Sequence, residues 1–259
     1  MRHRPPLEIV RSVIFALVLR EMRARFGQLR LGALWVFLEP VAHMAALSTL
    51  LVLRSHPSPG YDFLVWLIIG LAPFLLFKNI ALKLMGSVDA NKALFSYKQI
   101  QPADAFIART IVEFCISALV FAIIYSALTW YGYDTAIREP IRWLTVLLLG
   151  IVISFSIGIL FAIIVEVVPE AAFVLRLLFL PLYFLSGVIF SPYRIPQEYL
   201  VYVLWNPYLH IIDLLRDSTF KNYPLHREIS LGYIVECAIV FLFLACAAYR
   251  IRRFRLMAL

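Results

Sequence analysis

The chain has 259 residues, of which 63% are hydrophobic and 15% are charged. Soluble domains have about 45–50% apolar and about 25% charged residues, so a soluble fold of this size could not bury so much apolar surface. The net charge of +8 comes from basic residues that flank apolar runs, as membrane orientation requires, and this argues against a nucleic-acid partner. Composition therefore predicts an all-α membrane protein.

The first predicted element, within residues 1–32, is a cytoplasmic amphipathic helix that lies on the membrane. Apolar residues recur at helical spacing from Leu7 to Leu17, with polar residues on another face. A signal peptide would need small residues at the end of this run, but basic residues follow instead: Arg20, Arg23 and Arg25. We therefore expect an interface helix here and not a cleavable signal.

Six apolar runs follow, and a membrane-spanning helix needs about 20 such residues. Five are long enough: 33–53, 63–85, 105–130, 141–165 and 231–249. The sixth, at 173–190, is shorter and carries Arg176 near its start, where a long side chain could reach the interface. We expect a six-span domain over 33–250 and a basic cytoplasmic tail over 251–259.

A further apolar run, at 199–215, is cut by Asn206-Pro207 into two pieces too short to cross a bilayer. Proline disfavours helix in the residue before it. Non-helical backbone at membrane depth is tolerated only against protein or a water-filled cavity. We therefore expect short re-entrant helices on the outer side.

The distribution of basic residues favours a cytoplasmic N-terminus. With six spans, 17 of the 24 Lys and Arg residues fall inside and the remaining 7 outside. A seventh span would place the basic run from Arg250 to Arg255 outside, against the positive-inside rule. Both termini are thus predicted to be cytoplasmic.

Motifs for catalysis are missing from the sequence. It has no Gly-rich phosphate-binding loop, no His-Glu-x-x-His zinc motif and no Gly-x-Ser-x-Gly turn. We therefore expect no catalytic residue, no metal site and no cofactor in this chain.

Two couples of polar residues lie within the predicted spans, each at a spacing of four. A charge in a span is costly and suggests function, whereas polar side chains also fix helix packing. Packing is the favoured interpretation for Glu39 and His43 in the first span. Arg109 and Glu113, at the inner end of the third span, are expected to form a local pair.

The inner loop from Gly86 to Asp104 mixes polar and apolar residues. It fits either a short exposed helix that docks on a partner or an amphipathic loop on lipid headgroups. The docking interpretation depends on five residues: Lys92, Leu94, Phe95, Tyr97 and Lys98.

Aromatic residues crowd the predicted outer side, at Tyr193, Tyr199, Tyr202, Trp205 and Tyr208. They fit an aromatic belt at the membrane interface. They also fit an aromatic-lined exit, because Tyr and Trp combine an apolar face with a polar tip that suits a wet, sugar-bearing path.

Several stretches together resemble the permeases of ABC type 2 exporters. The start of the first span, RARFGQLRLGALWVFLEP (Arg23 to Pro40), is similar to the entry of these permeases. Four stretches resemble the branch of these permeases that exports capsular polysaccharide: EPVAH (39–43), ANKALFSYKQIQPADAFIAR (90–109), PLYFLSGVIF (181–190) and LWNPYLHIIDLLRD (204–217).

This resemblance implies a homodimeric permease of the bacterial inner membrane with two copies of a separate ATPase, which would hold ATP and magnesium. Lipid-linked polysaccharide would cross between the permeases, and periplasmic and outer-membrane partners would carry it onward. Ala90 to Lys98 would be a coupling helix on the ATPase, where the N-terminal helix would also pack. Glu166 and Glu170, in another inner loop, are further expected coupling residues.

The resemblance also implies that the short outer helices form a gate, with Asn206, Pro207, Tyr208, His210 and Asp213 in the gate and substrate path. Other functions stay open at this point. They are export of O-antigen or teichoic acid, efflux of small molecules and, from another class, a membrane-embedded lipid transferase.

Overall fold

The computed structural model describes residues 6–26, 32–52, 61–97 and 99–258, and these residues form helices joined by turns and loops. The long helices are α1 (Pro6–Phe26), α2 (Gly32–Val52), α3 (Phe63–Met85), α5 (Pro102–Trp130), α6 (Pro140–Val167) and α11 (Leu231–Ala258). The short elements are α4 (Ser87–Asn91), η1 (Lys92–Leu94), α7 (Ala171–Leu177), α8 (Phe179–Leu185), η2 (Pro192–Arg194), α9 (Gln197–Leu200) and α10 (Pro207–Asp217).

Four of the described helices, α3, α5, α6 and α11, are long and apolar enough to cross a membrane. They differ in burial: 72% of the most apolar stretch of α3 is buried, against 17% of that of α11. Helix α3 is therefore the centre of the bundle, and it packs against α5, α6 and α10. Outward apolar side chains such as those of α5 and α11 are typical of helices that cross a membrane.

Proline sets several helix boundaries. Pro102 and Pro140 begin α5 and α6, where a missing N–H costs nothing. Pro181 has the opposite effect, because its ring and missing N–H disturb the turn that ends at Leu177. The sixth apolar run is therefore broken at Leu178 into two short helices, α7 and α8. The second of these, α8, ends at Leu185.

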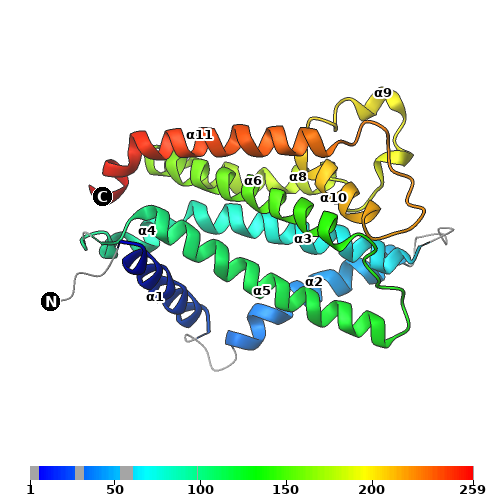
Figure 1. Cartoon of the computed structure of the whole chain (residues 1–259), viewed down its shortest axis with the longest axis horizontal. Coiled ribbons are helices and arrows are strands. Elements are labelled where there is room, and N and C mark those ends of the chain that lie inside the picture. The colour runs from blue at the N-terminus through cyan, green and yellow to red at the C-terminus, as the bar shows by residue number, and fades with distance from the viewer. Residues whose placement is uncertain (1–5, 27–31, 53–60, 98, 259) are drawn as a thin grey trace.

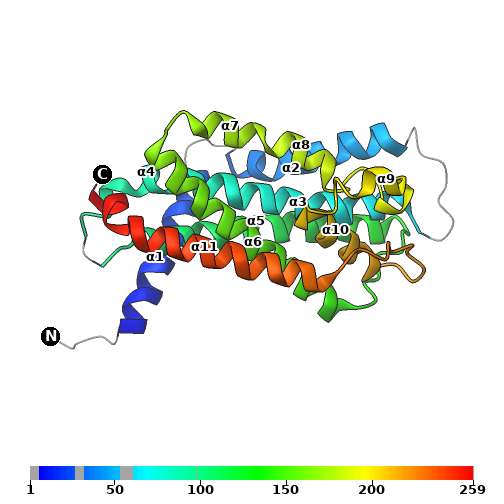
Figure 2. The same ribbon diagram turned by 90° about the horizontal axis from the view of Figure 1, so that it is seen from above.

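Different elements lie at the two ends of the bundle (Figure 1). Helix α4 and the last turns of α11 lie at one end, which we call the α4 end, and α9 and α10 lie at the other, the α10 end. Helix α1 projects obliquely from the α4 end (Figure 2). Residues 251–258, within the expected basic tail, are helical and continue α11 as far as Ala258.

Candidate functional site

Helix α1 is attached to the start of α5 by two ion pairs at the α4 end. Glu21 and Arg25 lie four residues apart on α1. They face Arg109 and Glu113, which have the same spacing on α5. Arg109 Nε lies 2.9 Å from Glu21 Oε1, and Arg25 donates to the Glu113 carboxylate. The prediction that Arg109 pairs with Glu113 is therefore wrong. On α1 the acidic residue comes before the basic one, and on α5 the basic residue comes first. Each charged residue therefore pairs with the opposite charge on the other helix and not with the one on its own helix.

Both partners of the second pair are largely removed from solvent. The side chain of Glu113 is 3% exposed and that of Arg25 is 16% exposed. Burial lowers the pKa of Arg25 and the nearby charge of Glu21 raises it, but arginine stays a cation throughout the physiological range. Removing either partner would leave a poorly hydrated charge, so this contact fixes how α1 lies on α5.

The same helix also contacts the segment expected to couple to an ATPase. Arg20 donates to Asn91 Oδ1 at 2.7 Å and to the Ala90 carbonyl at 3.0 Å. Asn91 in turn donates to the Ser87 carbonyl at 2.8 Å, at the start of α4. One arginine of α1 thus links it to the C-terminal end of α4. Arg23 is exposed on the same helix.

The expectation that Phe95 is exposed on this segment is wrong. Phe95 is 6% exposed and belongs to the apolar core, whereas Tyr97 is 64% exposed. The tight turn after η1 places the Phe95 ring in the core and the Tyr97 ring on the surface. Leu94 is half-buried and Lys92 is exposed. Lys98 lies outside the described residues.

The end of α6 and the start of α7 each carry a carboxylate, and one of the two contacts a basic residue of α11. Glu166 is half-buried and lies 3.6 Å from Arg252 near the end of α11, while Glu170 is exposed. Glu166 therefore links α6 to α11 within this chain. Of these two carboxylates, Glu170 is the one available to an outside partner.

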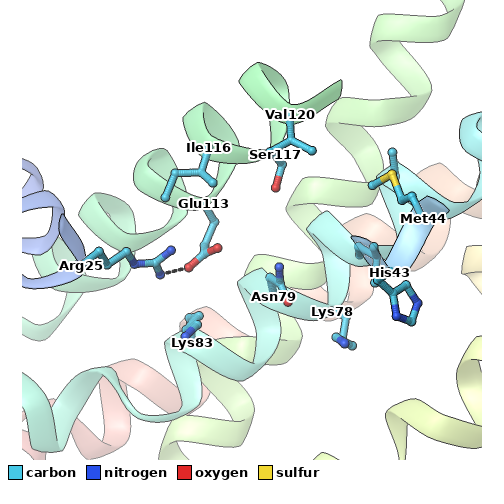
Figure 3. A pocket seen from close by; sticks show the side chains of 12 residues that line it. Arg25, His43, Met44, Lys78, Asn79, Lys83, Glu113, Ile116, Ser117 and Val120 are labelled. Carbon is cyan, nitrogen blue, oxygen red and sulfur yellow. Dashed lines mark hydrogen bonds and ion pairs between the residues drawn. The ribbon is translucent and has the colours of Figure 1, made fainter. Parts of the chain in front are cut away.

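A cavity of about 360 Å³ lies between α1, α2, α3 and α5, and we call it the basic cavity (Figure 3). Its basic lining residues are Arg25, His43, Lys78 and Lys83. Glu113 also lines it, bound by Arg25 (Figure 3). Of the four residues singled out in the spans, His43 and Glu113 line this cavity, and Arg109 donates to the carbonyl of Lys83, another lining residue. The side chain of the fourth, Glu39, is outside the described residues.

At the α10 end, the expected gate residues divide into two groups. Four aromatic side chains are 61–72% exposed around α9: Tyr193, Tyr199, Tyr202 and Trp205. The other five are buried in α10 or at its start: Asn206, Pro207, Tyr208, His210 and Asp213. The first group can meet lipid, a partner or substrate, and the second packs within this chain.

The break at Asn206-Pro207 has a local cause. The Asn206 side chain accepts a hydrogen bond from the Tyr208 N–H at 3.0 Å, which caps α10, and Pro207 occupies the first helical position. The Asn206 amide also donates to Ser186 Oγ at 3.0 Å. The expected interruption of this run by Asn-Pro is thereby confirmed, and the capping residue also contacts the end of α8.

The buried polar residues of α10 have protein partners. Asp213 accepts from the Tyr223 hydroxyl at 2.5 Å. His210 Nδ1 accepts from the Ser230 N–H at 3.2 Å, which leaves Nε2 to donate to the Leu204 carbonyl at 2.7 Å. These contacts hold α10 against the loops on either side of it.

Sequence reasoning missed the role of Arg216, which it counted as an outer-loop charge. Arg216 is fully buried, and its guanidinium lies 3.5 Å from the centre of the Trp66 ring. It donates to the carbonyls of Gly187 and Val188 at 2.7 and 2.8 Å. A Cβ on Gly70 would lie 2.3 Å from Arg216 Nη2, so this glycine makes room for the guanidinium.

Arg216 thereby joins α10, α3 and the loop after α8. In the local sequence, Arg216 is simply an arginine in the last turn of a short helix. Its partners lie about 30 and 150 residues away in the sequence, so a local pattern could not reveal them.

Comparison with known proteins identifies the family. The family model described as ABC-2 type transporter matches residues 12–220. The chain belongs to the ABC-2 type transporter family. The match extends from α1 through α10, so the α1–α5 contacts and the Arg216 cluster both lie within the family's region.

Individual proteins match over most of the chain. The polysialic acid transport protein KpsM of Escherichia coli is 35% identical over 96% of both chains. The capsule polysaccharide export inner-membrane protein CtrC of Neisseria meningitidis is 26% identical over 93% of this chain and 91% of its own. BexB of Haemophilus influenzae, which carries the same description, is 23% identical over 88% and 86%.

Proposed function

We propose that this chain is the membrane-spanning permease subunit of an ABC exporter that moves lipid-linked capsular polysaccharide across the inner membrane. The observation that carries the proposal is the 35% identity to KpsM over 96% of both chains. Two further relatives are named for capsule polysaccharide export at the inner membrane. These names favour capsular polysaccharide over O-antigen, teichoic acid or small molecules, and transport over lipid transfer.

The proposed topology has six spans with both termini in the cytoplasm. Helices α3, α5, α6 and α11 supply four spans by length and composition. Helix α2, with 21 residues, and the broken α7–α8 segment would supply the other two. The α4 end would then be cytoplasmic, because α4 and the basic last turns of α11 lie there (Figure 1).

A separate ATPase would bind ATP and magnesium and contact the α4 end of each permease in a homodimer. Tyr97 and Lys92 are exposed there, and Arg20 ties that segment to α1. ATP can drive export only by favouring one arrangement of the ATPase over another. The Arg20–Asn91 contact would let α1 and the coupling segment respond together, as one rigid unit.

The α10 end would face the periplasm and meet the departing polysaccharide and its periplasmic and outer-membrane export partners. Four exposed aromatic side chains surround α9 at this end, and Arg216 fixes the loop beside them. Aromatic faces with polar tips suit contact with sugar rings.

Complementation of a capsulated bacterium that lacks its own permease tests this function. Cells that carry this chain with its ATPase should display surface polysaccharide, and cells that carry an empty vector should accumulate it in the cytoplasm. Cytoplasmic accumulation in both strains, with the chain present in the membrane at a normal level, would contradict the proposal.

A further inference from the structure

A second cavity, which we call the apolar groove, lies between α2, α3 and α5 and has a volume of about 800 Å³. It follows the basic cavity along α3 and α5. The basic cavity is lined by α3 from Ala72 onward and by α5 up to Val120, whereas the groove is lined by α3 up to Ile68 and by α5 from Ile123 onward. Met44 of α2, which is 4% exposed, lines both cavities and separates them (Figure 3).

The lining of the groove favours hydrocarbon. Among the lining residues that the structure describes, none carries a charge. The Thr49 hydroxyl donates to the Ala45 carbonyl at 2.8 Å, so it is satisfied within α2. Water gains little in an apolar cavity that offers few polar partners, and an empty groove would deprive its walls of dispersion contacts. A hydrocarbon chain is the occupant that meets both conditions.

The depth of the groove matches one leaflet of a bilayer. Two of its walls, α3 and α5, are long and apolar enough to cross a membrane. The groove extends from Tyr131, directly after α5, to Ile123 within it. These eight residues correspond to roughly 12 Å at about 1.5 Å per residue. Half of a hydrocarbon core of about 30 Å is about 15 Å, so a chain from a single leaflet would nearly fill the groove.

The open end of the groove lies at the α10 end, where α3 begins and α5 ends (Figure 1). Tyr131 and Tyr133 line it there and are 79% and 37% exposed. Tyrosine is enriched at the membrane–water interface, where an apolar ring and a polar hydroxyl both find suitable surroundings. A lipid could therefore insert its chain at this end while its headgroup stays outside, beside the tyrosines.

We propose that the apolar groove binds one acyl chain of a bilayer phospholipid from the leaflet at the α10 end, which is the periplasmic leaflet in the proposed topology. The chain would lie between α2 and the α3–α5 pair and would end at Met44. Such a lipid would fill the seam along which α2 joins the bundle. The site depends on the lining of the groove and not on the substrate of the exporter.

Native mass spectrometry tests the site with the full-length chain, purified in a non-ionic detergent from cells that make no capsular polysaccharide. Each chain should retain one phospholipid after a wash that removes loosely held lipid. Added phosphatidylglycerol and phosphatidylcholine with the same chains should displace it equally well, because the groove contacts hydrocarbon and not the headgroup. The absence of retained phospholipid would overturn the proposal. So would a preference of about tenfold or more for one headgroup, equivalent to about 1.4 kcal/mol.

Matched variants locate the bound chain. Ala127→Trp fills the groove from α5 and should lower lipid retention about tenfold or more. Ala122→Trp is the control, because Ala122 is exposed on the same helix and does not line the groove; it should retain lipid as wild type does. Ala45→Phe fills the groove from α2 and should also lose the lipid, so the test does not depend on the folding of one variant. Equal retention in the filled variants and the control would overturn the proposal.

The same measurement distinguishes a second copy of the chain from lipid. If a second copy covered the groove, the wild type would be a dimer without phospholipid, and Ala127→Trp would convert it into a monomer. That result would overturn the proposal. Failed complementation would contradict the proposed function and leave the lipid site standing, because retention of phospholipid involves neither transport nor polysaccharide.

Discussion

The Arg25–Glu113 contact predicts a local weakening when Glu113 is changed to Gln. The side chain of Glu113 is 3% exposed, and Arg25 is its charged partner on α1. A hydrogen bond to a charged group contributes about 1.5–3 kcal/mol, so the change should favour detachment of α1 by about 2 kcal/mol. Since 1.4 kcal/mol is a factor of ten, the detached population should rise about thirtyfold.

Hydrogen exchange followed by mass spectrometry measures that opening directly. Amides of α1 should exchange about thirtyfold faster in the Glu113→Gln protein, while those of α6 and α10 should be unchanged. Glu139→Gln is the control, because Glu139 is 55% exposed in its pair with Arg142 and exposed pairs contribute only about 0–1 kcal/mol. The charge swap Arg25→Glu, Glu113→Arg should restore part of the protection. Unchanged exchange in α1 would refute the reasoning, and faster exchange throughout the bundle would show a global effect instead.

Three further predictions test other parts of the structure. Gly70→Ala should displace the buried guanidinium of α10 and lower stability by about 1–3 kcal/mol, whereas Gly86→Ala, which has open space around it, should leave the melting temperature unchanged. Phe95→Ala should lower the stability of the fold by about 3–5 kcal/mol because the ring is buried. Tyr97→Ala should leave stability unchanged and weaken capture of the ATPase. Loss of stability in the Tyr97 variant but not in the Phe95 variant would contradict the structure. A cysteine at exposed Lys221 should react with an impermeant maleimide from the periplasmic side, and reaction from the cytoplasm alone would contradict the topology.

Local chemistry made part of this fold predictable. The break at Asn206-Pro207 follows from the geometry of proline and the capping ability of asparagine, both of which act within a few residues. The long apolar helices follow from length and composition in the same way. Pro181 was visible in the sequence too, although its effect on the sixth run was not foreseen.

Contacts between distant segments could not be predicted in this way. Spacing correctly placed Arg109 and Glu113 on one helix face, but it could not show that α1 covers that face and supplies both partners. Nor could it show that Phe95 is turned into the core. Arg216 obtains its partners from α3 and from the loop after α8, which only the folded chain brings together.

ATP-driven translocation by purified components tests the central claim most directly. The chain and its ATPase would be reconstituted into vesicles that carry lipid-linked capsular polysaccharide in the outer leaflet only, and a polysaccharide-degrading enzyme would be enclosed within the vesicles. With ATP added outside, the enclosed enzyme should degrade the polysaccharide as it arrives, and degradation should stop when the ATPase is inactivated. Polysaccharide that stays protected while ATP is hydrolysed, with both subunits assembled, would contradict the assignment of this chain as the polysaccharide permease.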